Sequence, residues 1–377
     1  MRLLKNALVF KHNIIKQMNQ LIIPFHTILL FSIMPVFLSC SSRNHAVAED
    51  KKEITTSVKI GDTVSALDKS IYCIFQDSKN NFWFASNVEG IYRYDGKTLL
   101  YFTTKHGLCN KIVRDIKEDK SGNIFFSTQQ GGICKFDGEK FTTLPVSKSN
   151  APEKDWKLEP DDLWFKGETG KNGPYRWDGK TLYHLEFPKH FLSDEYYAKY
   201  PNTAWSPYEI YNIYQDHKGN VWFGTGSFGV CRYDGKSLSW LYEDHLTHIA
   251  GGGTFGIRSI LEDKNGQFWF SNTSYRYDMS DSISTLKDRT LINYKKETGI
   301  ADFKAPDGKS MIYFLSAVED NFGNMWMVTY EQGVWKYDEK TMTNYPIKNE
   351  GNDVKLFTVY TDHKDDLWLG TDGAGAY

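Results

Sequence analysis

The sequence predicts an all-β fold, a seven-bladed β-propeller of four-stranded antiparallel blades. Three observations lead to this prediction: a short phrase recurs along the chain, each copy holds several short β-rich segments, and seven copies are present. The phrase is clearest at residues 215–235, QDHKGNVWFGTGSFGVCRYDG, where a turn aspartate precedes a tryptophan by six residues. Recurrence at intervals of roughly 40 to 60 residues is typical of a repeat architecture.

The first 40 residues predict a secretory signal. Lysines precede an apolar run at 21–38, and the small residues SCSS follow it. Cys40 in this position resembles a bacterial lipobox, which implies that Cys40 is acylated and becomes the mature N-terminus. An uncleaved membrane anchor is the alternative, and both interpretations place the rest of the chain outside the cytoplasm. Residues 41–53 are polar and suit a tether.

Each copy of the phrase opens with a turn residue and places a large ring six residues later. The rings are Trp83, Phe125, Trp222, Trp269, Trp326 and Trp368, with Trp164 in a degenerate copy. A lone sheet cannot bury aromatic residues on both faces, whereas sheets packed face to face around an axis can. We therefore expect these rings to fill the space between blades, each costing roughly 3–5 kcal/mol if cut to alanine.

Within one copy, four short segments predict strands. In the first copy these are IYCIFQD, FWFAS, GIYRYD and TLLYFTT, which are rich in β-branched and aromatic residues. Turns such as DHKGN separate the first two strands, and a second turn, usually Asp-Gly, separates the last two. The second turns contain Asp95, Asp137, Asp178, Asp234, Asp278 and Asp338.

The propeller is expected to span 54–377. Its blades should begin near residues 71, 112, 158, 210, 257, 312 and 356. The last copy stops inside its third strand, at GTDGAGAY. We expect one of two arrangements for the last blade. Either it is incomplete because the sequence is a truncated fragment, or an N-terminal strand at 54–60, ITTSVKI, closes it.

Charge and cysteine pattern restrict the classes of function. The formal net charge is −2 with mixed signs, so nothing attracts nucleic acid by bulk charge. The chain has no CxxC, HxH or HExxH, and we expect no metal and no cofactor. Cys134 and Cys231 occupy the same position of the repeat, which favours small apolar packing. A disulfide between Cys73 and Cys109 is left open.

The repeat resembles the two-component regulator propeller repeat. The pattern D-x-x-G-N-x-W-F-G-T followed by G-[VI]-x-R-Y-D-G-K carries the resemblance over residues 71–377. This resemblance implies the extracellular sensor of a hybrid histidine kinase, some of which are said to recognise glycan fragments. The chain contains no kinase or response-regulator segment, so the resemblance supports the propeller more strongly than the signalling role.

The two sets of connections differ in how much they vary. The turns after the first and third strands are short and nearly constant, whereas the other set varies widely and includes a long insert at 186–209. In an up-and-down sheet these two sets lie on opposite faces. Since binding sites concentrate on variable loops over a rigid frame, we expect function on the variable face.

Counting back five residues from each turn aspartate places Tyr72, Arg114, Tyr211 and Arg258 at the channel mouth, where they are candidates for ligand binding. The alternative is that they wedge blades apart and satisfy loop carbonyls. Counting back four gives small or polar groups that suit a wet channel: Cys73, Asp115, Asn212, Ser259, Ser316 and Thr358. In the insert, Trp205 and Tyr208 are further ligand candidates, or part of a cap with its own core.

Two functions compete. The first is a binding module in the periplasm or on the cell surface that recognises a glycan, a peptide or an envelope protein. The second is a lyase or glycosidase, with His106 or His248 as a weak candidate base. The chain is similar in repeat style to streptogramin lyases, propeller enzymes that act through a histidine, without a specific motif match. Two carboxylates at the channel mouth would favour the enzyme.

Overall fold

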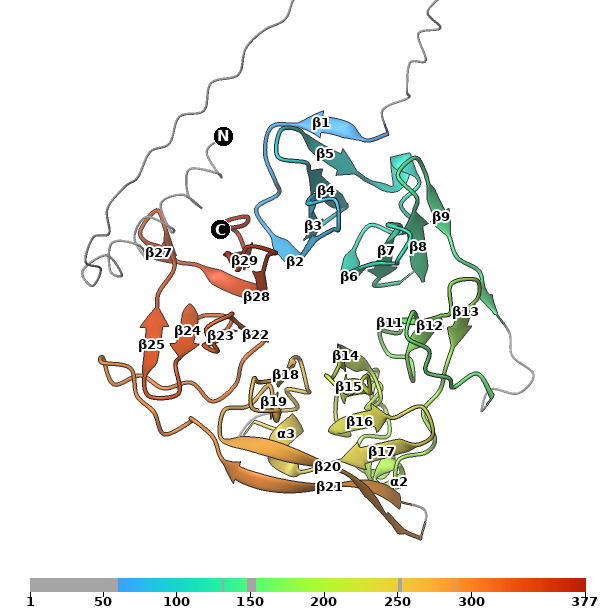
Figure 1. The fold of residues 1–377 in the computed structure, drawn as a ribbon, viewed down its shortest axis with the longest axis vertical. Helices are drawn as coiled ribbons and strands as arrows, with labels where there is room; N and C mark the ends of the chain where they lie inside the picture. Colours follow the sequence, from blue (N-terminus) through green and yellow to red (C-terminus); the bar gives the residue numbers. More distant parts are fainter. Residues whose placement is uncertain (1–59, 131, 148–153, 250–252, 288) are drawn as a thin grey trace, which may run out of the picture. The chain divides into compact units, whose positions relative to one another are not determined.

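The computed structural model of the protein describes residues 60–377 except 131, 148–153, 250–252 and 288. The predicted signal with Cys40, the tether and the strand expected at 54–59 lie outside the described residues. Within residues 60–377, antiparallel sheets follow one another around an axis in chain order (Figure 1). The prediction of an all-β fold is confirmed. Across the described residues, no helix has the length and apolar character to cross a membrane.

The second sheet has the four predicted strands, and the first has them with an additional outer strand. Their strands are β1 (Asp62–Val64), β2 (Ile71–Gln76), β3 (Phe82–Ser86), β4 (Ile91–Tyr94), β5 (Leu99–Phe102), β6 (Val113–Glu118), β7 (Ile124–Thr128), β8 (Ile133–Phe136) and β9 (Phe141–Thr143). The sheet orders are β1-β5-β4-β3-β2 and β6-β7-β8-β9, and the additional strand β1 pairs antiparallel with β5. The 3-10 helix η2 (Thr104–His106) connects the two sheets.

The third sheet departs from the predicted four-strand pattern. It contains β10 (Val146–Ser147), β11 (Leu163–Phe165), β12 (Tyr175–Trp177) and β13 (Leu182–His184) in the order β10-β13-β12-β11. β10 pairs in parallel with β13 at the outer edge, and the described residues between β10 and β11 form no strand. The inner first strand expected near 158 is therefore missing, because the charged stretch before β11 contains Pro160, which disfavours a central strand.

The fourth and fifth copies share one eight-stranded sheet. Its strands are β14 (Ile210–Gln215), β15 (Val221–Thr225), β16 (Val230–Tyr233), β17 (Leu238–Leu241), β18 (Ile260–Glu262), β19 (Gln267–Phe270), β20 (Tyr275–Leu286) and β21 (Arg289–Thr298). The long hairpin β20-β21 joins the outer strand β17 in parallel. The turn predicted at Asp278 is wrong, because Asp278 lies inside β20 and pairs with Lys295. Met279 stands where most copies have a glycine, so the strand continues.

The last sheets complete the circuit. Their strands are β22 (Ser316–Glu319), β23 (Met325–Val328), β24 (Val334–Tyr337), β25 (Met342–Tyr345), the outer hairpin β26 (Lys348–Asn349) and β27 (Asn352–Asp353), and finally β28 (Lys355–Thr361) and β29 (Leu367–Asp372). The backbone N–H groups of Gly373 and Gly375 donate to Lys69 O, at N···O distances of 3.0 and 2.6 Å. The count of seven blades stays a prediction, since the final sheet has two strands.

The aromatic column fills the spaces between neighbouring sheets, as predicted. Trp83 packs on Phe126 of the next sheet with ring centroids 5.4 Å apart, and Trp222 packs on Phe268 at 4.7 Å. Trp368 packs on Phe82 at 4.5 Å, which brings the last sheet against the first. Burial of these rings supplies much of the hydrophobic stabilisation of the fold.

The turn aspartate does more than cap its own turn. In Asp216, Oδ1 accepts from the backbone N–H groups of Lys218 and Asn220, and Oδ2 accepts from the Trp222 indole at 2.8 Å. The same indole-to-carboxylate bond occurs in four other copies, at Asp77, Asp263, Asp320 and Asp362. This buried bond explains the fixed spacing of six residues between the aspartate and the tryptophan.

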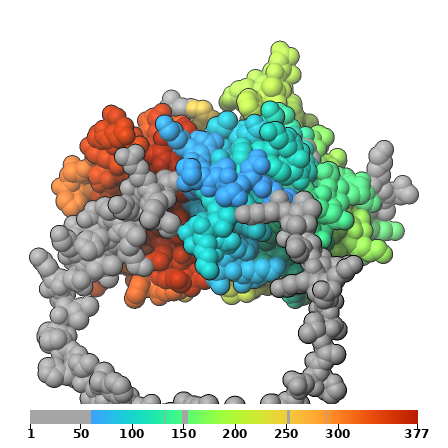
Figure 2. Space-filling view, turned by 90° about the horizontal axis from the view of Figure 1, so that it is seen from above, coloured from blue at the N-terminus to red at the C-terminus, as the bar shows by residue number. Residues whose placement is uncertain are grey.

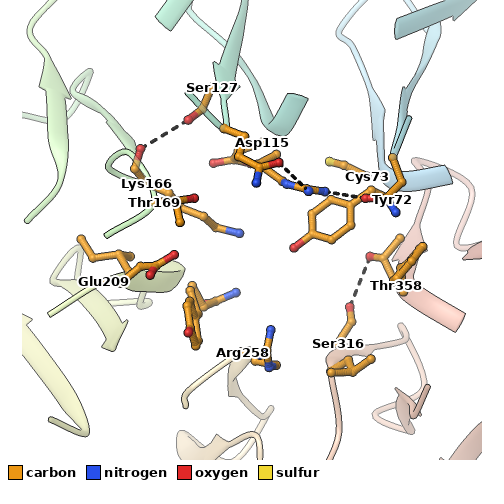
Figure 3. A pocket seen from close by; sticks show the side chains of 18 of the residues that line it. Tyr72, Cys73, Asp115, Ser127, Lys166, Thr169, Glu209, Arg258, Ser316 and Thr358 are labelled. Atoms are coloured by element: carbon orange, nitrogen blue, oxygen red, sulfur yellow. Dashed lines mark hydrogen bonds between the residues drawn. The ribbon is translucent and has the colours of Figure 1, made fainter. Parts of the chain in front are cut away.

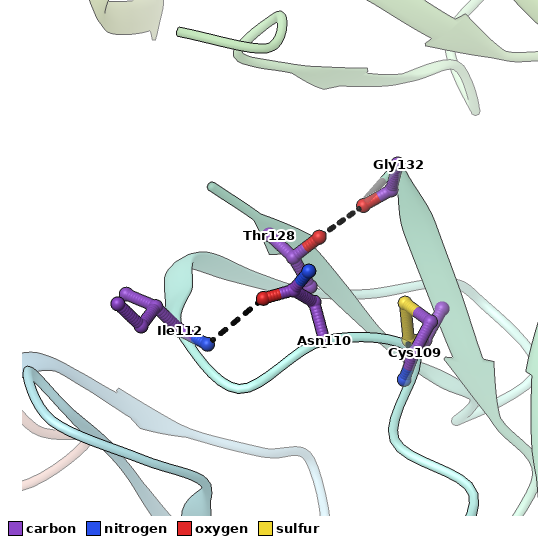
Figure 4. The surroundings of a disulfide bond; sticks show 6 residues. Cys109, Asn110, Ile112, Thr128 and Gly132 are labelled. Atoms are coloured by element: carbon purple, nitrogen blue, oxygen red, sulfur yellow. Dashed lines mark hydrogen bonds between the residues drawn. A yellow bond between two sulfur atoms is a disulfide. The ribbon is translucent and has the colours of Figure 1, made fainter. Parts of the chain in front are cut away.

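The structure corrects the cysteine predictions. A disulfide joins Cys109 to Cys134, with Cα atoms 5.8 Å apart, a separation that suits such a bond (Figure 4). Cys134 is therefore not a free apolar residue, and Cys73 does not pair with Cys109. Cys73 and Cys231 are free. Sequence spacing cannot choose among possible pairings, because the connection between β5 and β6 decides which thiol comes close.

The variable connections and the insert share one face. The helix α2 (Ser193–Lys199) belongs to the insert, and the short helix α3 (Asp244–Thr247) belongs to the connection between β17 and β18. Figure 2 shows the yellow-green residues near 200 protruding from one side of the ring. Tyr196 and Tyr208 pack on Phe228 of the connection between β15 and β16, with ring centroids 5.7 and 4.7 Å apart, so part of the insert joins the core of the neighbouring sheets.

Candidate functional site

A cavity of about 650 Å³ opens at the centre of the ring. Its walls come from the first residues of inner strands, from the ends of the second strands, and from the connections next to them. These parts all lie toward the variable face, so the cavity is the mouth of the channel on that face. Figure 3 shows Tyr72, Lys166, Glu209 and Arg258 facing a common open space from different copies of the repeat.

β-bulges aim side chains into this cavity. The pairing of β2 with β3 shifts between Ile71 and Cys73, which leaves Tyr72 as the extra residue. Shifts in the same place make Arg114, Tyr211 and Phe357 the extra residues of β6, β14 and β28. In a regular strand Tyr72 and Cys73 would face opposite sides, and the bulge allows both to line the cavity.

Arg114 is held rigidly in the wall. Its guanidinium lies 4.4 Å from the centre of the Tyr72 ring. Its two Nη atoms donate to the side-chain oxygens of Asn87 and Gln129, at 2.7 and 2.8 Å. Burial lowers the pKa of Arg114 below its ordinary value, but the group stays charged near neutral pH. Because both Nη atoms already donate to side chains of the wall, Arg114 has two roles. It orients the Tyr72 ring, and it adds positive charge to the cavity.

Arg258 forms a second tyrosine–arginine pair. Its side chain is more available to a ligand than that of Arg114. Its guanidinium lies 4.7 Å from the centre of the Tyr211 ring and 5.4 Å from that of Phe255. Nε donates to the carbonyl oxygen of Phe255 at 3.1 Å, which fits the alternative that such arginines satisfy loop carbonyls. Among the described residues, its Nη atoms have no hydrogen-bond partner. Arg258 is exposed, so these donors face the open cavity.

Lys166 enters the cavity because the third sheet has no inner strand. In the other copies the corresponding position, two residues after the ring, is small: Ala85, Ser127, Gly224, Ser271, Val328 and Gly370. A side chain at Gly370 would lie 2.6 Å from the carbonyl oxygen of Ile71 on the next inner strand. Lys166 lies at the end of β11, which is itself the strand nearest the axis, and lines the cavity with Thr169.

Two carboxylates line the same cavity. Asp115 Oδ1 accepts from the backbone N–H of Ile116 at 3.0 Å, and Lys117 Nζ lies 3.7 Å from its Oδ2. Glu209 is half-buried, and its Oε2 has no hydrogen-bond partner among the described groups. Burial raises the pKa of Glu209, while the Gly170 backbone and the charge of Arg258 oppose that shift. Asp115 thus has a cation beside it, whereas one oxygen of Glu209 has no hydrogen-bond partner among the described groups.

The cavity floor carries four more of the predicted channel residues, whereas Ser259 is buried and does not line the cavity. Cys73, Asn212, Ser316 and Thr358 line it, and Ser316 Oγ lies 3.4 Å from Thr358 Oγ1. Burial, followed by the charge of Asp115, raises the pKa of the Cys73 thiol to about 12, so Cys73 is an inert wall group. Within the part of the chain that the structure describes, no three His, Cys, Asp or Glu side chains gather as metal ligands.

Four predicted residues do not line the cavity. Trp205 is 63% exposed on the insert, and Tyr208 is buried, its hydroxyl accepting from the His190 N–H at 2.6 Å. His106 Nδ1 accepts from the Thr103 N–H in the cap of η2, at the outer part of the ring. His248 Nδ1 lies 3.0 Å from Thr247 Oγ1 and also outside the cavity.

The structure adds residues that the sequence prediction missed, chiefly Lys166, Glu209, Asn87 and Gln129. Lys166 carried a usable signal, since a lysine in a column of small residues breaks the repeat. Glu209 carried none, because it lies in a long insert with no counterpart in other copies. Asn87 and Gln129 follow the second strands at equivalent positions, and only the geometry reveals that they share Arg114.

The comparisons with known proteins agree with this architecture. The family model described as two component regulator propeller matches residues 65–88 and 205–227, which confirms the resemblance predicted from the sequence. No curated protein matches the chain.

Two similar solved structures are extracellular domains from B. thetaiotaomicron, each named as a hybrid two component system. One is 15% identical with a TM-score of 0.54, covering 82% of this chain and 39% of its own. The other is 18% identical with a TM-score of 0.55, covering 84% of this chain and 38% of its own. This chain therefore spans about two fifths of the length of those domains.

A third similar structure is virginiamycin B lyase from Staphylococcus aureus, solved with quinupristin. It is 13% identical with a TM-score of 0.57, and the match covers 84% of this chain and 96% of the lyase. At these identities the similarity concerns the fold alone, which is a propeller. It does not decide between a sensor domain and an enzyme.

Proposed function

We propose that the protein is an extracytoplasmic binding module whose central cavity on the variable face holds a glycan fragment. The observation that carries the proposal is the cavity of about 650 Å³ walled by two tyrosine–arginine pairs. A pocket with a few fixed polar groups beside aromatic faces is the usual form of a small-ligand site. Hydrogen bonds to Asn87 and Gln129 hold Arg114 in place, so this pair loses little conformational freedom when a ligand binds.

The sensor-like part of the proposal draws on the repeat family and on the similar extracellular domains. Binding at the channel mouth suits such a role, because the mouth is built from several sheets at once and a ligand there would tie them together. The proposed lipid anchor at Cys40 would keep the module at a membrane, where an envelope protein could respond to the occupied state. A peptide in the same cavity is the alternative ligand.

An oligosaccharide array probed with the purified chain tests the proposal. We expect selective binding, and we expect Arg258→Ala to weaken it at least about tenfold, because hydrogen bonds to a charged group are lost. The matched control is Phe322→Ala, which removes an 80% exposed ring from the turn between β22 and β23 on the opposite face. Absence of any saccharide binding, or equal binding by the Arg258 variant, would contradict the proposal.

An enzyme is the second candidate, because two carboxylates line the cavity as the sequence argument required. Burial raises the pKa of Glu209, which makes it the candidate for the general acid, and Asp115 is the other carboxylate. If the chain cleaves its ligand, Glu209→Gln should abolish product formation while leaving ligand affinity within a few-fold. Mass spectrometry of a bound oligosaccharide after prolonged incubation checks this. An intact ligand would exclude the candidate.

A further inference from the structure

We propose that the ligand is an acidic, extended oligosaccharide, with a negative group held between Lys166 and Arg258 and a chain that leaves the cavity over Tyr330 along the sixth copy of the repeat. This inference rests on the proposed function, and it names the class of ligand and the path it takes. Two independent features of the described residues support it: the charge balance of the cavity and a second hollow beside it.

The charge balance favours an anion. Three cations line the cavity, Arg114, Lys166 and Arg258, against two carboxylates, Asp115 and Glu209. Lys117 already stands beside Asp115, at 3.7 Å. Lys166 Nζ has no ion-pair partner within 4.0 Å in the described part of the chain, and neither has Arg258. A carboxylate or sulfate placed between them would receive charge-assisted hydrogen bonds at a partly desolvated site.

The absent inner strand of the third sheet explains how Lys166 comes to line the cavity. A lysine at the end of β11 reaches the axis only because no strand of its own sheet covers it. Lys166 is half-buried without a close ion-pair partner in the described residues, and burial of a charge costs desolvation energy. Such an arrangement is expected where a ligand brings the opposite charge.

A second hollow of about 380 Å³ lies beside the cavity. It runs between the connection that holds Met311 and Ile312 and the turn after β23 that holds Tyr330 and Gln332. Tyr330 borders both spaces, and its hydroxyl donates to Asp372 at 2.9 Å, which fixes the ring. A ligand longer than the central cavity therefore has a path outward over a fixed aromatic ring.

The lining of the second hollow suits a sugar. Tyr330 is 37% exposed and Ile312 is 44% exposed, and Lys355 Nζ lies 4.9 Å from the centre of the Tyr330 ring. The exposed part of this ring and Ile312 offer apolar surface to a pyranose. Glu331 and Gln332 add polar groups to the lining. Apolar surface beside polar groups suits a saccharide chain, whose rings have apolar faces and hydroxylated edges.

The test uses the purified full chain on an array that contains uronic-acid, sulfated and neutral oligosaccharides of two to eight units. Calorimetry on the best binders then compares Lys166→Met with Lys236→Met, which removes an exposed charge from the turn between β16 and β17 on the opposite face. Tyr330→Ala is compared with Phe322→Ala in the same way.

We expect acidic chains to bind best, with affinity that falls as salt rises. Lys166→Met should cost at least about tenfold and Tyr330→Ala should abolish the gain in affinity from short to long chains, with both controls unchanged. Selective binding of neutral chains, or acidic binding that neither variant alters, overturns this inference and leaves the proposed binding function standing. Binding of no saccharide at all overturns the proposed function itself.

Discussion

The buried bond between the indole and the turn carboxylate makes a sharp prediction about stability, because the chain contains its own control. Trp222 donates to Asp216 at 2.8 Å. Trp164 occupies the same column in the third sheet, but Leu158 stands where its aspartate would be, and its buried indole N–H has no acceptor. Trp222→Phe and Trp164→Phe thus remove the same atoms, and only one of them breaks a hydrogen bond.

The expected difference in the free energy of unfolding between the two variants follows from two contributions, the loss of packing and the loss of the hydrogen bond. Shrinking a tightly packed indole to a phenyl ring costs on the order of 1 kcal/mol at either site. At Trp222 the change also removes a hydrogen bond to a charged group, which adds roughly 1.5–3 kcal/mol. At Trp164 it removes an unsatisfied buried donor, which offsets part of the packing loss. Trp222→Phe should therefore destabilise the protein by about 2 kcal/mol more than Trp164→Phe.

Urea unfolding followed by far-ultraviolet circular dichroism measures both variants without depending on the fluorescence of the altered residue. A double-mutant cycle with Asp216→Ala isolates the pair, and we expect a coupling free energy of roughly 1.5–3 kcal/mol. Equal midpoints for the two phenylalanine variants, or a coupling energy near zero, would refute the view that this bond fixes the six-residue spacing.

Three further predictions concern single groups. Loss of the Cys109–Cys134 bond in Cys134→Ser should cost about 2–4 kcal/mol in urea, and a reductant should lower the midpoint of the native chain but not of the variant. The Cys73 thiol, with a pKa of about 12 caused by burial, should resist iodoacetamide at pH 8 until the chain unfolds, as mass spectrometry can verify. Burial, aided by Arg289, lowers the pKa of His190 to about 3, below its unfolded value near 6.5. Its contribution to stability is therefore complete above that unfolded value and is lost as pH falls toward 3, and His190→Phe should flatten the profile of unfolding midpoint against pH.

Much of the fold could be predicted from the sequence because the spacing of residues in the repeat is set by contacts inside each copy. A ring six residues after each turn aspartate can only be buried between sheets, and the indole bond ties that spacing to a specific contact. The difference between constant turns and variable connections likewise indicated one face for function, and the cavity opens on that face. These features depend on local sequence, and their recurrence in several copies makes them recognisable.

The remaining features depend on contacts between strands or between copies, which the pattern of one strand does not contain. The bulges at Tyr72 and Arg114 arise where β2 pairs with β3 and β6 pairs with β7, inside one copy, so the residue pattern of β2 or β6 alone does not locate them. The disulfide requires a connection to bring Cys109 to β8. The long hairpin β20-β21 replaced a predicted turn because it joins β17, a partner from another copy.

The same contrast explains where function is expected in a repeat fold. Positions that agree across copies are occupied by the packing and turn contacts that hold the ring together, and they have little freedom to contact a ligand. Positions at which one copy differs from the others do not make those packing and turn contacts, so they can contact a ligand. Lys166 breaks a column of small residues, and the sheet that carries it lacks the strand and the aspartate that the other copies share. The third sheet lacks its inner strand where Lys166 reaches the cavity without an ion-pair partner in the described residues, and a bound anion would balance that charge.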